Sequence, residues 1–329
     1  PFLHSSGIWV FPNSWRSRPL PKKQKMQTIL GAGGAIGKEL AKVLPQYTDQ
    51  VRLVARNPKA VMGNEELVSA DLLDLEATKA AVQGSEVVYL CVGLTYNIKV
   101  WQSSWPRIMS NVIEACADAK AKLVFFDNIY MYHPSEMSNI TEESKKDPQS
   151  AKGKVRLGIL NQLWAAHKEG RIQATVARSA DFYGPNAGSV SVMEEAVLKP
   201  LQNGKAANWF ASLKNPHSFT YTIDAAKGTA ILGNSEIAWG EEWHLPTAKN
   251  PLTGKEYIET LAALVGAKPK TQVAGKGILR ILGWFNPIMK EFVEMIYQYD
   301  RPYYFNSEKF ESTFNYTPLS YQEGLKSLI

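Results

Sequence analysis

The stretch Thr28-Ile29-Leu30-Gly31-Ala32-Gly33-Gly34-Ala35-Ile36-Gly37-Lys38-Glu39-Leu40 decides how the front half of this chain folds. It passes from an apolar strand pattern through a glycine-rich turn into a helical pattern. A dinucleotide-binding motif needs these three parts in this order. The stretch therefore predicts a phosphate-binding turn between a first strand and a first helix.

Each glycine of the motif has a separate expected task. Gly31 allows the tight turn, Gly34 lets the backbone approach a pyrophosphate, and Gly37 lets the helix pack on the strand. The freed N–H groups and the positive end of the helix dipole then face the phosphates. The expected cofactor-binding residues of the loop are Gly31, Ala32, Gly34, Ala35, Ile36 and Gly37.

The residues that follow alternate short apolar runs with helical periodicity, which is typical of βαβ units and a parallel sheet. We expect strands over Gln27–Leu30, Val51–Ala55, Glu66–Ser69, Glu86–Val92, Lys122–Phe126 and Ile172–Arg178, and helices over Ile36–Leu44, Leu75–Val82, Trp105–Ala119 and Lys152–His167. The predicted fold class is α/β, a doubly wound parallel sheet (Rossmann) with a smaller mixed C-terminal part that binds substrate.

The predicted domain organisation has three parts. Residues 1–25 form an extension outside the fold, residues 26–180 form the dinucleotide-binding domain, and residues 181–329 form the substrate-binding part. Segments near 219–245 are expected to return to the Rossmann sheet. The extension is interpreted either as a targeting segment or, preferably, as sequence upstream of the native start at Met26.

Charge and composition narrow the classes of partner. Of the net charge of +6, five positive charges lie in residues 1–25, which contain no acid, so the remaining chain is close to neutral. This argues against nucleic-acid binding. The two cysteines, Cys91 and Cys116, are expected to be buried free thiols, and the scattered histidines predict no metal site. We expect a cytoplasmic protein with a small-molecule substrate, no membrane contact and a possible homo-oligomeric state.

The end of the second strand predicts the cofactor. NAD sites usually place an acidic residue there, to accept hydrogen bonds from the ribose hydroxyls. Here Ala55 leaves the acid absent, and Arg56 offers a guanidinium suited to a 2′-phosphate. We therefore predict NADP(H) in preference to NAD(H); a solvated surface arginine is the alternative.

Two further segments are expected along the cofactor, beyond the carboxyl ends of the strands. Asp71 and Leu72 follow the third strand and would lie near the adenine. Cys91, Val92 and Gly93 follow the fourth strand and would lie along the nicotinamide half.

At this point the chain resembles the extended and atypical short-chain dehydrogenase/reductase superfamily, in its NAD(P)-dependent epimerase/dehydratase-like branches. The spacing of Gly31, Gly34 and Gly37 is the form that this group uses. Further similar segments are Asp71-Leu72-Leu73-Asp74, Phe126–Tyr132, Arg178 with Phe182-Tyr183-Gly184-Pro185, and Phe219-Thr220-Tyr221-Thr222-Ile223-Asp224-Ala225-Ala226.

The catalytic set of that superfamily is changed in this chain. The resemblance calls for Ser or Thr after the fifth strand and Tyr-x-x-x-Lys on the next helix, but Asn128, Lys152 and Arg156 occupy those positions. Arg156 would still hold the nicotinamide ribose. Lys152 would serve as an acid/base if a like charge and partial burial favoured its neutral form. Two surface cations on one helix face are the equally weighted alternative.

Tyr130 and Tyr183 are the other candidate proton donors, although each is expected more often to pack than to react. The tentative catalytic residues are thus Lys152, Asn128 and Tyr130. The segment 278–297, amphipathic with a kink at Pro287, is expected to be a lid or core helix rather than a membrane-surface helix.

Two functions stay open. One is an NADP(H)-dependent oxidoreductase or epimerase that acts on a small carbonyl or hydroxyl compound or a sugar-nucleotide-like substrate. The other is a non-catalytic NAD(P) sensor or scaffold, which the missing Tyr-x-x-x-Lys set favours. We prefer the enzyme, because aromatic residues of the C-terminal half supply an apolar pocket.

Overall fold

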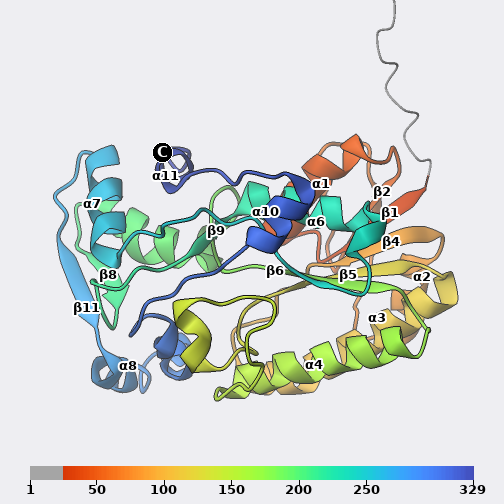
Figure 1. Cartoon of the computed structure of the whole chain (residues 1–329), viewed down its shortest axis with the longest axis horizontal. Coiled ribbons are helices and arrows are strands. Elements are labelled where there is room, and N and C mark those ends of the chain that lie inside the picture. Colours follow the sequence, from red (N-terminus) through yellow and green to blue (C-terminus); the bar gives the residue numbers. More distant parts are fainter. Residues whose placement is uncertain (1–24) are drawn as a thin grey trace, which may run out of the picture.

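The computed structural model describes residues 25–329, and its centre is a sheet of seven parallel strands (Figure 1). The strand order is β10-β6-β5-β4-β1-β2-β3. The bounds are β1 Met26–Leu30, β2 Val51–Ala55, β3 Glu66–Ser69, β4 Ser85–Leu90, β5 Lys122–Asp127, β6 Ala174–Arg178 and β10 Glu242–His244. This sheet, with helices on both faces, confirms the predicted doubly wound α/β fold.

Helices cover the two faces of the sheet in separate groups, seen above and below it in Figure 1. One face carries α1 (Ala35–Val43) and α6 (Thr222–Gly233), which pack on each other. The other carries α2 (Leu75–Val82), α3 (Ile98–Ala119) and α4 (Ala151–Lys168). Because both faces are covered, the central strands are mostly apolar, as is typical of a buried parallel sheet. The polar side chains of Gln27 and Thr28 in β1 are buried and hydrogen-bonded.

Helix α3 begins earlier than the sequence pattern suggested. It starts at Ile98 rather than Trp105, because the Asn97 side chain caps it by accepting hydrogen bonds from the N–H groups of Lys99 and Val100. Pro106 therefore lies inside the helix instead of in its first turn. The expected start was wrong because proline favours a first helical turn in sequence, whereas an asparagine cap is a weaker signal.

The extension predicted for residues 1–25 lies outside the described residues except for Lys25. The Lys25 carbonyl oxygen accepts a hydrogen bond from the Thr48 hydroxyl at 2.8 Å, and its ammonium contacts Glu86. Cys91 and Cys116 are both buried free thiols, as predicted.

The C-terminal part has its own aromatic core and two small parallel sheets. β7 (Asp181–Tyr183) pairs with β9 (Phe219–Tyr221), and β8 (Ala207–Phe210) pairs with β11 (Thr271–Ala274). Only β10 of the later strands enters the central sheet, where it lies beside β6. The segment 219–221 therefore stays in the C-terminal part, while α6, which follows it, packs on the Rossmann domain.

Short helices complete this part of the chain. They are α5 (Lys199–Gln202), α7 (Gly254–Leu264), α8 (Lys276–Leu282), α9 (Pro287–Phe292), α10 (Glu308–Phe314) and α11 (Tyr321–Lys326), with a π-helical turn at Met193–Leu198 and 3-10 turns at Leu44–Gln46, Pro134–Ser138, Gly188–Val190, Glu236–Ala238 and Val293–Gln298. Within residues 25–329, no helix is both long and apolar enough to cross a bilayer.

Candidate active site

The glycine-rich loop joins β1 to α1 and leaves no room for a side chain at Gly31 or Gly37. Gly31 has a φ of +91°, and a Cβ added there would lie 2.8 Å from the Cα of Val92. A Cβ on Gly37 would lie 2.6 Å from the carbonyl oxygen of Gly31. The loop is therefore held at van der Waals contact between β4 and α1, as a phosphate-binding turn of this type requires.

The first turn of α1 leaves its backbone donors available. Gly34 is the N-cap residue, and no side chain caps this helix within the part of the chain that the structure describes. The Gly34 N–H bonds to the Gly31 carbonyl at 3.1 Å, whereas Ala35 and Ile36 form the start of α1, where backbone N–H groups have no acceptor within the helix. Together with the helix dipole, this is the geometry that accepts an anion such as a pyrophosphate.

The residues predicted to lie near the adenine follow β2 and β3 at the same edge of the sheet. Arg56 is exposed, and its carbonyl oxygen accepts a hydrogen bond from the Ser69 hydroxyl at 2.8 Å, which fixes the backbone while leaving the guanidinium free to move. Asp71 Oδ1 accepts the N–H of Leu73 at 3.0 Å. The Leu72 carbonyl accepts a bond from the buried Asn111 amide at 2.9 Å, so α3 holds this turn in place.

The residues predicted to lie along the nicotinamide half continue directly from β4. The Cys91 N–H donates to the Leu30 carbonyl at 2.8 Å, which ties this segment to the strand before the glycine loop. Burial raises the pKa of the Cys91 thiol to about 12, so Cys91 stays protonated and acts as a small apolar residue. Val92 and Gly93 then lead the backbone along the loop that contains Gly31.

A buried ionic network closes the ends of β5 and β6. Arg156 donates from Nε to Asp127 Oδ1 at 2.8 Å and also contacts that oxygen through Nη2, while Arg178 donates to Asp127 Oδ2 at 3.2 Å. Arg178 also pairs with Glu242 of β10. Although burial opposes the charge, Arg178 and Lys146 lower the pKa of Glu242 to about 2.

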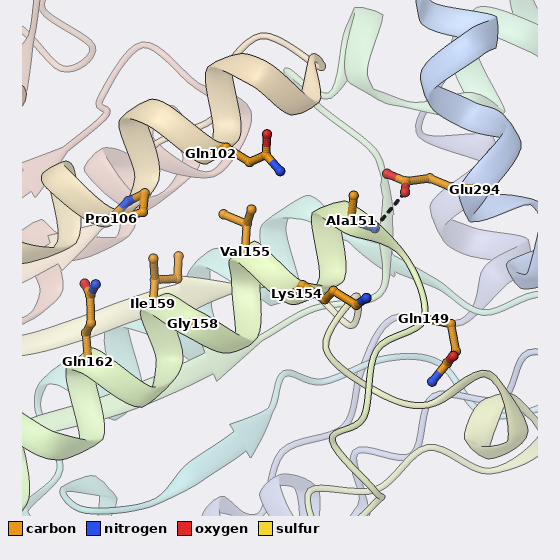
Figure 2. A pocket seen from close by; sticks show the side chains of 10 residues that line it. All are labelled: Gln102, Pro106, Gln149, Ala151, Lys154, Val155, Gly158, Ile159, Gln162 and Glu294. Carbon is orange, nitrogen blue, oxygen red and sulfur yellow. Dashed lines mark hydrogen bonds between the residues drawn. The ribbon is translucent and has the colours of Figure 1, made fainter.

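Lys152 has a different set of carboxylate partners. Its side chain is fully buried, and its ammonium contacts Glu291 and lies 2.9 Å from Glu294 Oε1. Figure 2 shows Glu294 reaching the start of α4, where it accepts the N–H of Ala151 at 2.7 Å. The expected like-charge effect of Arg156 on Lys152 is therefore offset by separate carboxylates, and the alternative of two surface cations is wrong because both side chains are buried.

Tyr130 lies beside this network and is partly exposed. It is hydrogen-bonded to Tyr96 and stacks on Trp101, and the Lys152 ammonium lies 4.6 Å from the centre of the Tyr96 ring. Burial and the Asp181 carboxylate raise the pKa of Tyr130, so its hydroxyl keeps its proton at neutral pH. The structure thus brings Lys152 and Tyr130 together on either side of Tyr96.

Asn128 and Tyr183 have structural contacts of their own. The Asn128 side-chain oxygen accepts the Tyr130 N–H at 3.0 Å, and its carbonyl accepts a bond from Arg178 at 3.1 Å. Tyr183 is buried in the C-terminal aromatic core, where its ring adjoins Gly324 and its hydroxyl has no partner among the described residues. Asn128 therefore orients the Tyr130 backbone, whereas Tyr183 packs away from Lys152.

Sequence reasoning missed four members of this site: Tyr96, Asp127, Glu291 and Glu294. Asp127 was detectable, since it closes the fifth strand directly before Asn128. The two glutamates lie more than 130 residues after Lys152. Their three-residue spacing places them on one helical face, but nothing in the sequence says which cation that face meets.

Comparisons with known proteins agree with this fold. The structure is similar to UDP-glucuronic acid 4-epimerase from Bacillus cereus in complex with NAD, with a TM-score of 0.74 and 18% identity over 92% of this chain and 96% of that one. It is also similar to dTDP-glucose 4,6-dehydratases with NAD from Streptomyces venezuelae (TM-score 0.73) and Bacillus anthracis (TM-score 0.75), each 16% identical over 92% of this chain and 94% of that one.

No curated protein sequence matches the chain significantly. A model of the NAD dependent epimerase/dehydratase family, however, matches residues 28–239, which include the glycine loop, β7 to α6, and Asp127, Arg156 and Arg178 of the ionic network. This match confirms the resemblance drawn from Gly31, Gly34 and Gly37, and it agrees with the preference for an enzyme of that type. The chain belongs to the NAD dependent epimerase/dehydratase family.

Proposed function

We propose that this protein is an NADP(H)-dependent oxidoreductase or epimerase that acts on a sugar-nucleotide-like or small carbonyl or hydroxyl substrate. The observation that carries the proposal is the close-packed glycine loop at the start of α1, followed at the end of β2 by a neutral Ala55 and an exposed Arg56. The similar solved structures are nucleotide-sugar epimerases and dehydratases, which supports this substrate class.

The residues around the loop fit a dinucleotide. Any side chain at Gly31 or Gly37 would fill the space at the loop. The backbone N–H groups of Ala35 and Ile36, at the start of α1, would hold the pyrophosphate. Arg56 would bind the 2′-phosphate as a charge-assisted pair. The bound nicotinamide would supply the hydride-transfer chemistry.

The protein itself must supply the proton that accompanies hydride transfer. The geometry supports Tyr130 over Lys152 as the proton donor. Lys152 exposes none of its side chain and is neutralised by two carboxylates, so a substrate does not reach its ammonium in this arrangement. Tyr130 is partly exposed, so its hydroxyl is the donor that a substrate can reach. Burial raises its pKa, so a bound cofactor and substrate would have to lower that pKa for proton transfer. Lys152 would then act as a positioning residue, since it fixes Tyr96, the hydrogen-bond partner of Tyr130.

A non-catalytic sensor or scaffold is the second candidate. The observation in its favour is that Arg156 and Lys152, which occupy the catalytic positions of the related superfamily, are engaged by Asp127, Glu291 and Glu294. In such a protein the cofactor would bind without turnover, and the ionic network would serve stability alone.

One experiment distinguishes these functions. NADPH and NADH are titrated into the full chain by calorimetry. The protein is then assayed with NADP⁺ on UDP-glucose, UDP-glucuronic acid and dTDP-glucose, and with NADPH on simple aldehydes. We expect NADPH to bind more tightly than NADH, and at least one substrate to turn over. Tighter NADH binding overturns the cofactor proposal. Tight NADPH binding with no turnover favours the sensor.

A further inference from the structure

The helical hairpin formed by α8 and α9 has two apolar faces, of which only one is covered. Leu279 is buried, and Met289 and Phe292 pack on the aromatic core of the C-terminal part. A Cβ on Gly283 would lie 2.9 Å from the Cα of Lys290, so the two helices are held in close contact. The hairpin is thus anchored to the core by its inner side.

The outer side of the hairpin is apolar as well, and it faces solvent. Trp284 and Phe285 at the tip expose 81% and 84% of their surface. The other exposed apolar side chains of the hairpin are Ile278, Ile281, Leu282 and Ile288. We call these six residues the hairpin patch. A soluble protein rarely gathers its exposed large apolar side chains in one segment unless that segment meets an apolar partner.

The charges around the hairpin patch have one sign. Residues 260–290 contain no acid and five cations: Lys268, Lys270, Lys276, Arg280 and Lys290. All five are exposed, and none forms an ion pair within residues 25–329. Arg280 and Lys290 line a shallow hollow together with Trp284.

The acids that follow the patch offset only part of this positive charge. Glu291 and Glu294, the next two acids in the sequence, both pair with Lys152, which leaves one net negative charge against the five cations. Figure 1 shows α8 at one end of the molecule, at the lower left. Unpaired cations next to an exposed tryptophan and phenylalanine match a surface that is anionic outside and apolar beneath.

We propose that the hairpin patch is a site for peripheral attachment to an anionic lipid bilayer. Trp284 and Phe285 would enter the boundary between headgroups and acyl chains, where aromatic rings are favoured. Lys276, Arg280 and Lys290 would bind lipid phosphates and carboxylates from the headgroup layer. This inference departs from the sequence-based expectation of no membrane contact, because the sequence pattern of 278–297 did not reveal which of its apolar residues lie outside.

The test measures sedimentation of the full chain with vesicles of phosphatidylcholine alone or mixed with phosphatidylserine. We expect binding to the mixed vesicles only, weakened by added salt. Because residues 1–25 carry basic residues of their own, every comparison is made between variants of the full chain. Replacing the three cations by glutamine (K276Q/R280Q/K290Q) should weaken binding on the order of a hundredfold, at about fivefold per charge.

The apolar contribution is tested with the double variant W284S/F285S, which should lose vesicle binding. The matched control is M62S/I237S, which removes two exposed apolar side chains from the Rossmann domain and should bind like the parent. With brominated phosphatidylcholine in the mixed vesicles, tryptophan fluorescence should be quenched in the parent and not in W284F. The proposal is overturned if W284S/F285S binds vesicles like the parent, or if that variant instead abolishes a concentration-dependent dimer, which would make a second copy the occupant.

Discussion

Arg156 donates two hydrogen bonds to a single carboxylate oxygen of Asp127, deep at the carboxyl end of β5. Both side chains are almost completely buried, and the other oxygen of Asp127 accepts a bond from Arg178. One carboxylate thus serves two buried guanidinium groups that come from α4 and β6.

Removing that carboxylate charge should be costly. In Asp127→Asn, Arg156 loses its one acidic partner among residues 25–329, so we expect the free energy of unfolding to fall by about 3–5 kcal/mol. Denaturant titration measures this change. The matched control is Asp118→Asn, which breaks an exposed pair with Lys79 and should cost less than about 1 kcal/mol. Equal losses of unfolding free energy in the two variants would show that the buried network contributes no more to stability than an exposed ion pair.

Cofactor preference should depend on one side chain. Arg56→Ala should weaken NADPH binding by about 1.5–3 kcal/mol, because a charge-assisted pair with the 2′-phosphate is lost. NADH lacks that phosphate, so its affinity is the internal control and should be unchanged. Calorimetry on parent and variant gives both numbers, and an equal loss for the two cofactors would contradict the role of Arg56.

The glycine loop offers a matched pair of substitutions. Gly37→Ala would place a methyl group 2.6 Å from the Gly31 carbonyl, whereas a Cβ at Gly33 meets nothing within 4 Å. We expect Gly37→Ala to lower thermal stability by about 1–3 kcal/mol and to impair NADPH binding, because α1 must move away from the loop. Gly33→Ala should retain parental stability. Similar melting temperatures for both variants would mean that the loop tolerates the shift.

Proton donation should depend on Tyr130. With an identified substrate, Tyr130→Phe should lower kcat by about 100-fold or more and leave NADPH affinity intact. Tyr304→Phe, at an exposed tyrosine, is the control. Lys152→Met should also lower kcat but, unlike Tyr130→Phe, reduce stability, because Glu291 and Glu294 lose their cation. Full turnover in Tyr130→Phe would mean that Lys152 or water donates the proton.

His244 should make stability depend on pH. Its Nδ1 donates to the Asn306 carbonyl at 2.7 Å and its Nε2 accepts from the Tyr132 hydroxyl at 2.8 Å, in a site next to Arg178. Burial and the Arg178 charge hold the pKa of His244 well below its usual range. The unfolded chain then binds a proton below about pH 6.5 that the folded chain does not, so stability is present above that pH and falls as pH decreases.

The slope from His244 should approach about 1.4 kcal/mol per pH unit between about pH 6 and 5. Denaturant titrations at several pH values measure it. His244→Gln removes the titrating group and should flatten the dependence over this interval, whereas His133→Gln, at a partly exposed histidine, should not. An unchanged slope in His244→Gln would assign the pH dependence to other groups.

The sequence was informative where local rules determine structure. The glycine spacing placed the phosphate turn, and the apolar runs located the strands of the Rossmann sheet, because a parallel strand buried on both faces is apolar along most of its length, as Val87–Leu90 of β4 is. Helix α4 was also placed correctly to within a residue at each end. These features depend on residues that are neighbours in the chain.

The site itself depends on residues that are far apart in the chain, and these pairings could not be predicted. The ionic partners of Lys152 are Glu291 and Glu294, and the ionic partner of Arg156 is Asp127. Likewise, the amphipathic pattern of 278–297 showed that one face is apolar. It did not show that apolar residues would remain on the outside, since burial depends on what the rest of the chain brings against them.

The late arrival of β10 in the central sheet has a consequence for biosynthesis. Arg178 closes β6, yet one of its two carboxylate partners, Glu242, is translated 64 residues later. A nascent chain that ends after β6 therefore has a guanidinium with one partner missing and an unpaired sheet edge. The Rossmann unit is complete only after β10 has emerged from the ribosome, so a fragment cut near residue 180 should be prone to aggregation rather than fold alone.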